Sequence, residues 1–132
     1  MTERFNRLVF RLAAAVVLAG AVPLLAHHSF GATYDSSTRV EIEGSVKEFV
    51  WRNPHSFLRV DVAQPDGTMK TWALEWGSIN QLTSAKLTRT TLRPGDRLVI
   101  SGQPARDQSS PRMLIVSMRR PADGWSWQGT VD

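Results

Sequence analysis

Hydrophobic and polar residues alternate with period two from Val40 to Val46, which is the signature of a strand with one buried face. Beyond residue 48 the apolar positions fall on the other parity. A β-bulge near Lys47 or Glu48 explains this shift, and Gly44 eases a strong bend. The pattern therefore predicts a long, bent first strand that can serve both halves of a small barrel.

Two further strands are predicted to follow as a meander. The segments 56–62 and 69–76 keep the period of two, and the second places Trp72 and Trp76 on one face. Between them, Gln-Pro-Asp-Gly at 64–67 is a strong turn signal, because Asp-Gly tolerates the positive φ angles of hairpins. We therefore expect these two strands to pair as a hairpin.

The period then changes to that of a short helix. Ser78 and Gln81 have the spacing of a capping box, in which a serine N-cap is followed three residues later by glutamine. Apolar residues at helical spacing predict a helix over 79–86. A second tight turn at 93–96 leads into a fourth strand at 97–101.

A fifth strand is expected at 112–118, after a polar loop at 105–111. It is almost continuously apolar, which predicts burial on both faces. Three strands, a helix and two strands are the order of an OB-fold, in which the helix closes one end of the barrel. We therefore predict an all-β fold with one short helix, built as a five-stranded OB-like barrel. An open β-sandwich with a surface helix is the alternative that the same pattern allows.

The chain divides into four predicted parts. Residues 1–26 form a leader, 27–39 an amino-terminal arm and 40–118 the OB-like barrel domain. Residues 119–132 follow neither period and are predicted to be a partly ordered C-terminal extension.

The leader has the features of a secretory signal peptide. Three arginines precede an uncharged apolar run at 12–25, and Ala26 is a small residue at the predicted cleavage position. The run is shorter than the ~20 apolar residues of a membrane-spanning helix, although a retained single-pass anchor is the alternative. We expect a periplasmic or secreted protein that begins at His27 and keeps no membrane anchor after cleavage.

Composition narrows the classes of partner. The net charge is +4, but the leader holds three arginines and one glutamate, so removing its net +2 leaves the mature protein near +2. No run of four basic residues occurs in the mature chain, which argues against a nucleic-acid partner. The chain has no cysteine, so stability must come from the core rather than from disulfides. We expect a monomer whose partner is a periplasmic protein or a small ligand.

Three histidines carry the most specific chemistry. His27 and His28 stand at the predicted new amino terminus, and His55 lies in an Asn-Pro-His sequence. An amino-terminal histidine can chelate a metal through its amine and its ring, and His55 or His28 can add a further nitrogen. Copper(II) favours such ligands among divalent first-row ions. We therefore predict a copper site at these residues. The alternative is that all three are metal-free, with His55 packed on Trp51 or capping a backbone group.

An aromatic region offers a second hypothesis. Trp51, Phe57 and Trp76 surround the predicted loop between the first two strands, a usual ligand face of OB-like barrels. The chain would then be a non-metal accessory protein that binds a protein or a small molecule there. Tryptophans at period two are more often core residues, and an oligonucleotide or oligosaccharide ligand follows only from analogy of fold.

Catalysis finds no support in the motifs. No catalytic constellation, glycine-rich phosphate loop or pair of carboxylates emerges, and Glu75 is predicted to be a lone, solvated carboxylate. We therefore do not expect an enzyme.

Several motifs together resemble a known family. Ala-His-His-Ser-Phe at 26–30, Trp-Arg-Asn-Pro-His at 51–55 and Leu-Arg-Pro-Gly-Asp at 92–96 are similar to motifs of a family of small exported bacterial proteins of unknown function. The resemblance covers most of the mature chain and implies export and a single small β-rich domain, with no activity attached. The chain departs from the family pattern at the helix, where Ile79 replaces a common proline and no glycine follows Lys86.

Overall fold

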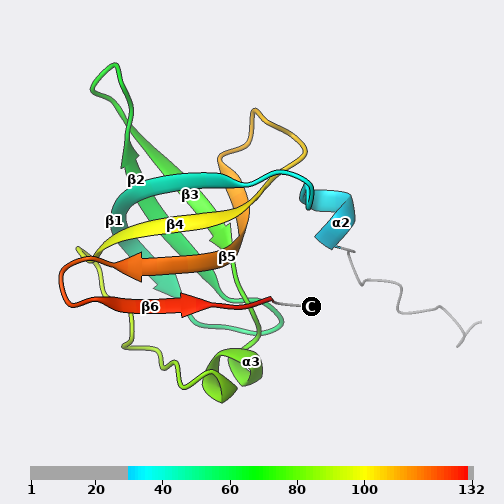
Figure 1. The fold of residues 1–132 in the computed structure, drawn as a ribbon, viewed down its shortest axis with the longest axis vertical. Coiled ribbons are helices and arrows are strands. Elements are labelled where there is room, and N and C mark those ends of the chain that lie inside the picture. The colour runs from blue at the N-terminus through cyan, green and yellow to red at the C-terminus, as the bar shows by residue number, and fades with distance from the viewer. Residues whose placement is uncertain (1–29, 131–132) are drawn as a thin grey trace, which may run out of the picture.

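The computed structural model describes residues 30–130, and its centre is a closed barrel of five strands (Figure 1). The strands are β1 (Val40–Val50), β2 (Phe57–Ala63), β3 (Met69–Glu75), β4 (Arg97–Pro104) and β5 (Arg112–Arg120). Four antiparallel pairings, β1 with β2, β1 with β4, β2 with β3 and β4 with β5, form most of the wall. A parallel pairing of β3 with β5 closes the ring. The predicted OB-like barrel is confirmed, and the closed ring rules out the open β-sandwich.

The bend in β1 allows one strand to serve both halves of the barrel. Its first half pairs with β4 and its second half with β2. The register with β2 shifts between Val46 and Glu48, where the bulge was predicted. A Cβ on Gly44 would meet the carbonyl oxygen of Asp61 at 2.5 Å, so the absence of a side chain allows β1 and β2 to approach closely.

Two short helices lie outside the barrel wall (Figure 1). α3 (Ile79–Ser84) begins with the predicted capping box, in which Ser78 and Gln81 each accept a hydrogen bond from the other's backbone amide. It ends two residues earlier than predicted, and Lys86 has a φ of 63°. α2 (Phe30–Thr33) precedes β1 and lies beside the loop between β4 and β5. No helix within residues 30–130 has the length and apolar character needed to cross a membrane.

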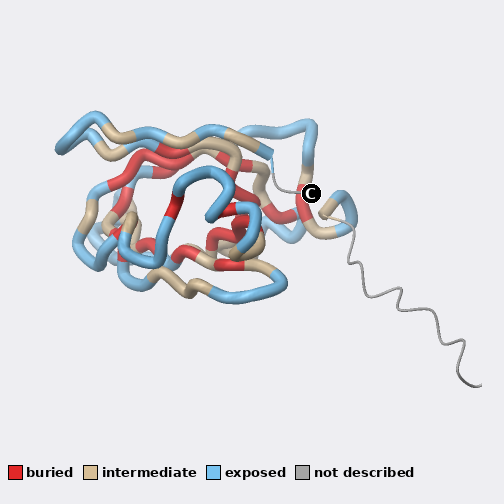
Figure 2. The backbone as a smooth tube through the Cα atoms, turned by 90° about the horizontal axis from the view of Figure 1, so that it is seen from below, coloured by how far each residue is buried: buried red, intermediate tan, exposed pale blue. Residues whose placement is uncertain are grey.

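The core fills the barrel and extends to α3. Figure 2 shows the buried segments in the middle of the molecule and the exposed segments at the turns and outer loops. On β5, Met113, Leu114 and Ile115 are consecutive and buried, as its apolar run predicted. The largest fully buried side chains are Tyr34, Leu58, Leu74, Trp76, Leu82, Leu92, Leu98, Ile100, Met113 and Ile115.

The C-terminal segment forms a sixth strand, where the sequence predicted only a partly ordered extension. β5 continues past the predicted boundary, and β6 (Trp125–Gln128) pairs antiparallel with its second half. The ring of Trp127 packs edge-on against Trp76, with 5.0 Å between the ring centroids. Four residues with two apolar positions are too few to show a period, so the pattern could not reveal this strand.

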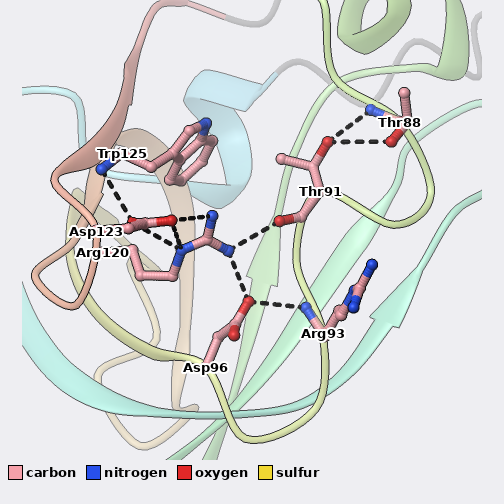
Figure 3. A network of polar contacts seen from close by, with 7 residues as sticks. All are labelled: Thr88, Thr91, Arg93, Asp96, Arg120, Asp123 and Trp125. Atoms are coloured by element: carbon pink, nitrogen blue, oxygen red, sulfur yellow. Dashed lines mark hydrogen bonds and ion pairs between the residues drawn. The ribbon is translucent and has the colours of Figure 1, made fainter.

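Arg120 ties this hairpin to the turn before β4 (Figure 3). Its Nη1 donates to Oδ2 of Asp96 at 2.8 Å and to the backbone oxygen of Thr91 at 2.9 Å. Its Nη2 donates to Oδ2 of Asp123 at 2.9 Å, and its guanidinium lies 5.4 Å from the ring centroid of Trp125. The contacts link three segments through one side chain that is only 17% exposed.

Candidate functional site

The loop between β1 and β2 holds His55 between two anchored neighbours. The preceding Asn53–Pro54 peptide is cis, and the Asn53 side chain accepts a hydrogen bond from the amide of Ile79 at 3.0 Å. On the other side, Ser56 is buried and its backbone continues the pairing of β2 with β3. His55 is thereby placed at the surface, with its side chain 31% exposed.

The ring of His55 is oriented by Glu75 at the end of β3. Nδ1 of His55 lies 2.6 Å from Oε1 of Glu75. An ionised carboxylate only accepts hydrogen bonds, so Nδ1 is the donor. Within residues 30–130, Nε2 makes no hydrogen bond, and this nitrogen is therefore the ring atom available to a ligand.

Glu75 is buried, and its second oxygen is also engaged. Oε2 accepts a hydrogen bond from the hydroxyl of Tyr34, and Nη2 of Arg112 lies 3.6 Å from it. Burial, and next the hydrogen bond to Glu75, raises the pKa of Tyr34 above its ordinary range, which keeps the hydroxyl protonated as a donor. The prediction of a solvated Glu75 is therefore wrong. The residue does lie on the face opposite Trp76, as its parity indicates, but the amino-terminal arm covers it.

The described part of the arm docks directly on this site. The ring of Phe30 lies 5.0 Å from the ring of His55 at 30°, and Tyr34 is fully buried beside it. Tyr34 forms a β-bridge with Ala105, and Arg106 donates from its backbone amide and its Nε to two carbonyl oxygens of α2, both at 2.9 Å. The arm is thus fixed by backbone pairing and side-chain contacts.

Of the three predicted metal ligands, His55 alone lies within the described residues 30–130. His55 lies at the surface beside the arm, whereas His27 and His28 lie outside the described residues. Among residues 30–130 there is no group of three His, Cys, Asp or Glu side chains that could hold a metal ion.

The predicted aromatic surface is only partly exposed. Trp51 and Phe57 are half-buried, and the guanidinium of Arg52 lies 5.1 Å from the ring centroid of Phe57. Trp76 is fully buried and contacts the rings of Phe49 and Trp127, so it cannot contribute to an exposed surface. The prediction placed Trp76 there because the covering strand β6 was not foreseen.

Three residues that form the contacts around His55 and Glu75 were not predicted from the sequence to be site residues. Tyr34 and Arg112 lie in segments with no recognisable motif, and only the structure brings them to Glu75. Glu75 itself had a signal, because a carboxylate stands between Leu74 and Trp76 in an otherwise apolar stretch. Such a carboxylate is either solvated or buried with partners, and here it is buried.

Comparisons with known proteins agree with the predicted resemblance. A family model described as a family of unknown function (DUF6152) matches residues 14–113, a range that includes His27, His28, His55 and Glu75. Among solved structures, the chain is similar to the mitochondrial single-stranded DNA-binding protein Rim1 from S. cerevisiae. The TM-score is 0.49 at 12% sequence identity, over 64% of this chain and 93% of that chain. No curated protein matches the chain.

Proposed function

We propose that this chain, which belongs to the family of unknown function DUF6152, is an exported, non-catalytic binding module that holds a copper ion at its amino-terminal arm. His27 supplies its amine and its imidazole, and His55 supplies a third nitrogen. His28 is the other candidate for the third position. The observation that carries the proposal is the contact of Phe30 with His55.

The contact supports the proposal because Phe30, close in sequence to His27 and His28, packs against the partly exposed imidazole of His55. His27 and His28 precede Phe30 by three and two residues. An extended chain spans about 3.5 Å per residue, so the Cα of His27 lies within roughly 11 Å of the Cα of Phe30. Since the Phe30 ring is 5.0 Å from the His55 ring, a mature protein that starts at His27 can bring its amine to His55.

The donor set determines the choice of metal. Cleavage before His27 would create a free amine beside an imidazole, and these two nitrogens form a chelate. A second imidazole, from His55 or His28, completes a T-shaped set of three nitrogens. Nitrogen ligands of this kind bind copper(II) more tightly than the other divalent first-row ions, including zinc. Affinity should fall as the pH falls, because protons compete for the same nitrogens.

A copper(II) titration of three forms tests the proposal. The first is the mature protein starting at His27, the second is the same protein with an acetylated amino terminus, and the third is His55→Ala. We expect tight binding by the first form and clear losses in the other two, with zinc(II) bound more weakly by the mature form. A fourth form, His28→Ala, decides which histidine supplies the third nitrogen.

Equal copper affinity in the first three forms would reduce the site to adventitious histidine binding. The chain would then be better described as a non-metal accessory protein. One observation favours that second function: the half-buried Trp51 and Phe57 lie at the loop face, with the exposed Arg52 stacked over Phe57. Such a surface suits a protein or small-molecule partner with both apolar and acidic groups.

A further inference from the structure

We infer that Glu75 is the positioning residue of this site, an inference that rests on the proposed copper function. Through Oε1 it keeps the proton of His55 on Nδ1 and leaves Nε2 as the metal-binding nitrogen. Through Oε2 it holds Tyr34, and with it the arm that carries His27 and His28. One buried carboxylate thereby joins the two parts of the chain that supply the ligands.

The first half of this inference follows from the geometry at Oε1. The contact of 2.6 Å with Nδ1 is a charge-assisted hydrogen bond to an acceptor that cannot donate. Histidines that bind metals characteristically donate their other ring proton to a carboxylate or carbonyl, which fixes both tautomer and ring orientation. His55 has this arrangement, because its Nδ1 faces Oε1 of Glu75.

The second half follows from the burial and the partners of Oε2. Tyr34 is fully buried, and its hydroxyl reaches Glu75 from a residue 41 positions earlier in the chain. Tyr34 also lies four residues after Phe30, whose ring packs on His55. The same carboxylate therefore contacts the imidazole and the anchor of the arm.

The substitution Glu75→Gln is a sharp test because it keeps the shape and changes the donor pattern. Tyr34 and Arg112 both offer donors to the position of Oε2, so the glutamine oxygen is expected to settle on that side. Its amide NH2 would then face His55 and donate to Nδ1. The proton of His55 would move to Nε2, and the nitrogen that should bind copper would be blocked.

The experiment measures the tautomer of His55 in metal-free mature protein by long-range 15N–1H correlation, followed by copper(II) titration. We expect the proton on Nδ1 in the wild type and on Nε2 in Glu75→Gln, with copper affinity reduced about 10–100-fold in the variant. Glu48→Gln is the matched control, since Glu48 is 56% exposed and, within residues 30–130, pairs only with Arg59 at the surface. Its tautomer and affinity should equal those of the wild type.

Tyr34→Phe separates the two roles of the carboxylate. This substitution removes only the hydroxyl that donates to Oε2 of Glu75. The contact of Oε1 with His55 remains, so the proton should stay on Nδ1. Copper affinity should still fall, because the arm is held less firmly. A wild-type proton on Nε2, or a Glu75→Gln protein that retains both the wild-type tautomer and affinity, would overturn the inference. A wild type with the expected tautomer but no copper binding would instead overturn the proposed function, and the orientation of His55 by Glu75 would stand.

Discussion

At the residue scale, Glu75 shows how one buried carboxylate organises residues that are far apart in the chain. Its two carboxylate oxygens form hydrogen bonds with His55, 20 residues earlier in the chain, and with Tyr34, 41 residues earlier. Arg112 forms an ion pair with the same carboxylate. A buried charge is costly unless its hydrogen bonds are satisfied. Hydrogen bonds with His55 and Tyr34, together with the ion pair to Arg112, satisfy Glu75, which explains why an acidic side chain is tolerated beside the core.

Asp35, directly after Tyr34, gives a pH-dependent prediction. Hydrogen bonds from Ser37 and then Thr38 lower the pKa of Asp35 to about 2. A carboxyl whose pKa is lowered by folding stabilises the fold above its unfolded pKa of about 3.9, and this contribution is lost as the pH falls toward 2. Asp35→Ala should therefore be less stable than the wild type at pH 6, with the difference vanishing near pH 2 in urea denaturation.

The hydroxyl donors supply the control for this prediction. In a Ser37→Ala, Thr38→Val background, the same Asp35→Ala change should cost less at pH 6, because the two side-chain hydrogen bonds are already absent. A stability difference that stays constant from pH 6 to pH 2 would contradict the assignment of these bonds to the ionised form.

At the scale of a single element, β1 depends on the missing side chain of Gly44. A Cβ at this position would lie 2.5 Å from both the Asp61 carbonyl oxygen and Cγ1 of Val60, and a backbone oxygen cannot rotate away. Gly44→Ala should therefore lower the free energy of unfolding by about 1–3 kcal/mol, the usual cost of overpacking. Ser45→Ala, one residue later on the other face, should cost much less. Equal urea midpoints for the two variants would refute the close approach of β1 and β2.

The β5–β6 hairpin depends on the contacts of the Arg120 side chain. Arg120→Met removes the links to Asp96, Asp123 and Thr91, and leaves Asp96 partly buried without its cation. We expect a loss of about 2–4 kcal/mol, together with faster amide hydrogen exchange in β6. Arg119→Met is the matched control, because the exposed Arg119 makes no side-chain hydrogen bond or ion pair within residues 30–130. Similar exchange rates in both variants would show that β6 is held by strand pairing alone.

At the scale of the whole molecule, the barrel was predictable because its signals are local and repeated. The alternation in β1 to β4, the shift of parity beyond residue 48 and the capping box at Ser78 each lie within a short window of sequence. The cluster around Glu75 was not predictable, because it joins segments 20 or more residues apart and depends on tertiary docking of the arm. The burial of Trp76 by β6 was missed for the same reason.

Copper is expected to stabilise the whole mature protein against thermal unfolding. An ion that binds only the folded state raises the free energy of unfolding by about 2.7 kcal/mol when its free concentration is 100 times Kd. For a domain of about 100 residues this corresponds to a rise in Tm of roughly 10 °C or more. The mature form starting at His27 should show the rise, because the proposed donors belong to the arm and to the β1–β2 loop, which would come together only in the folded state.

Two altered forms of the mature protein serve as controls for this rise in Tm. The form with an acetylated amino terminus keeps every side chain but loses the chelate of amine and imidazole at His27, so its Tm should rise much less. His55→Ala keeps the chelate but loses the link to the barrel, so copper bound there would hardly distinguish folded from unfolded chains. A rise in Tm of equal size in all three forms would place the copper elsewhere on the molecule.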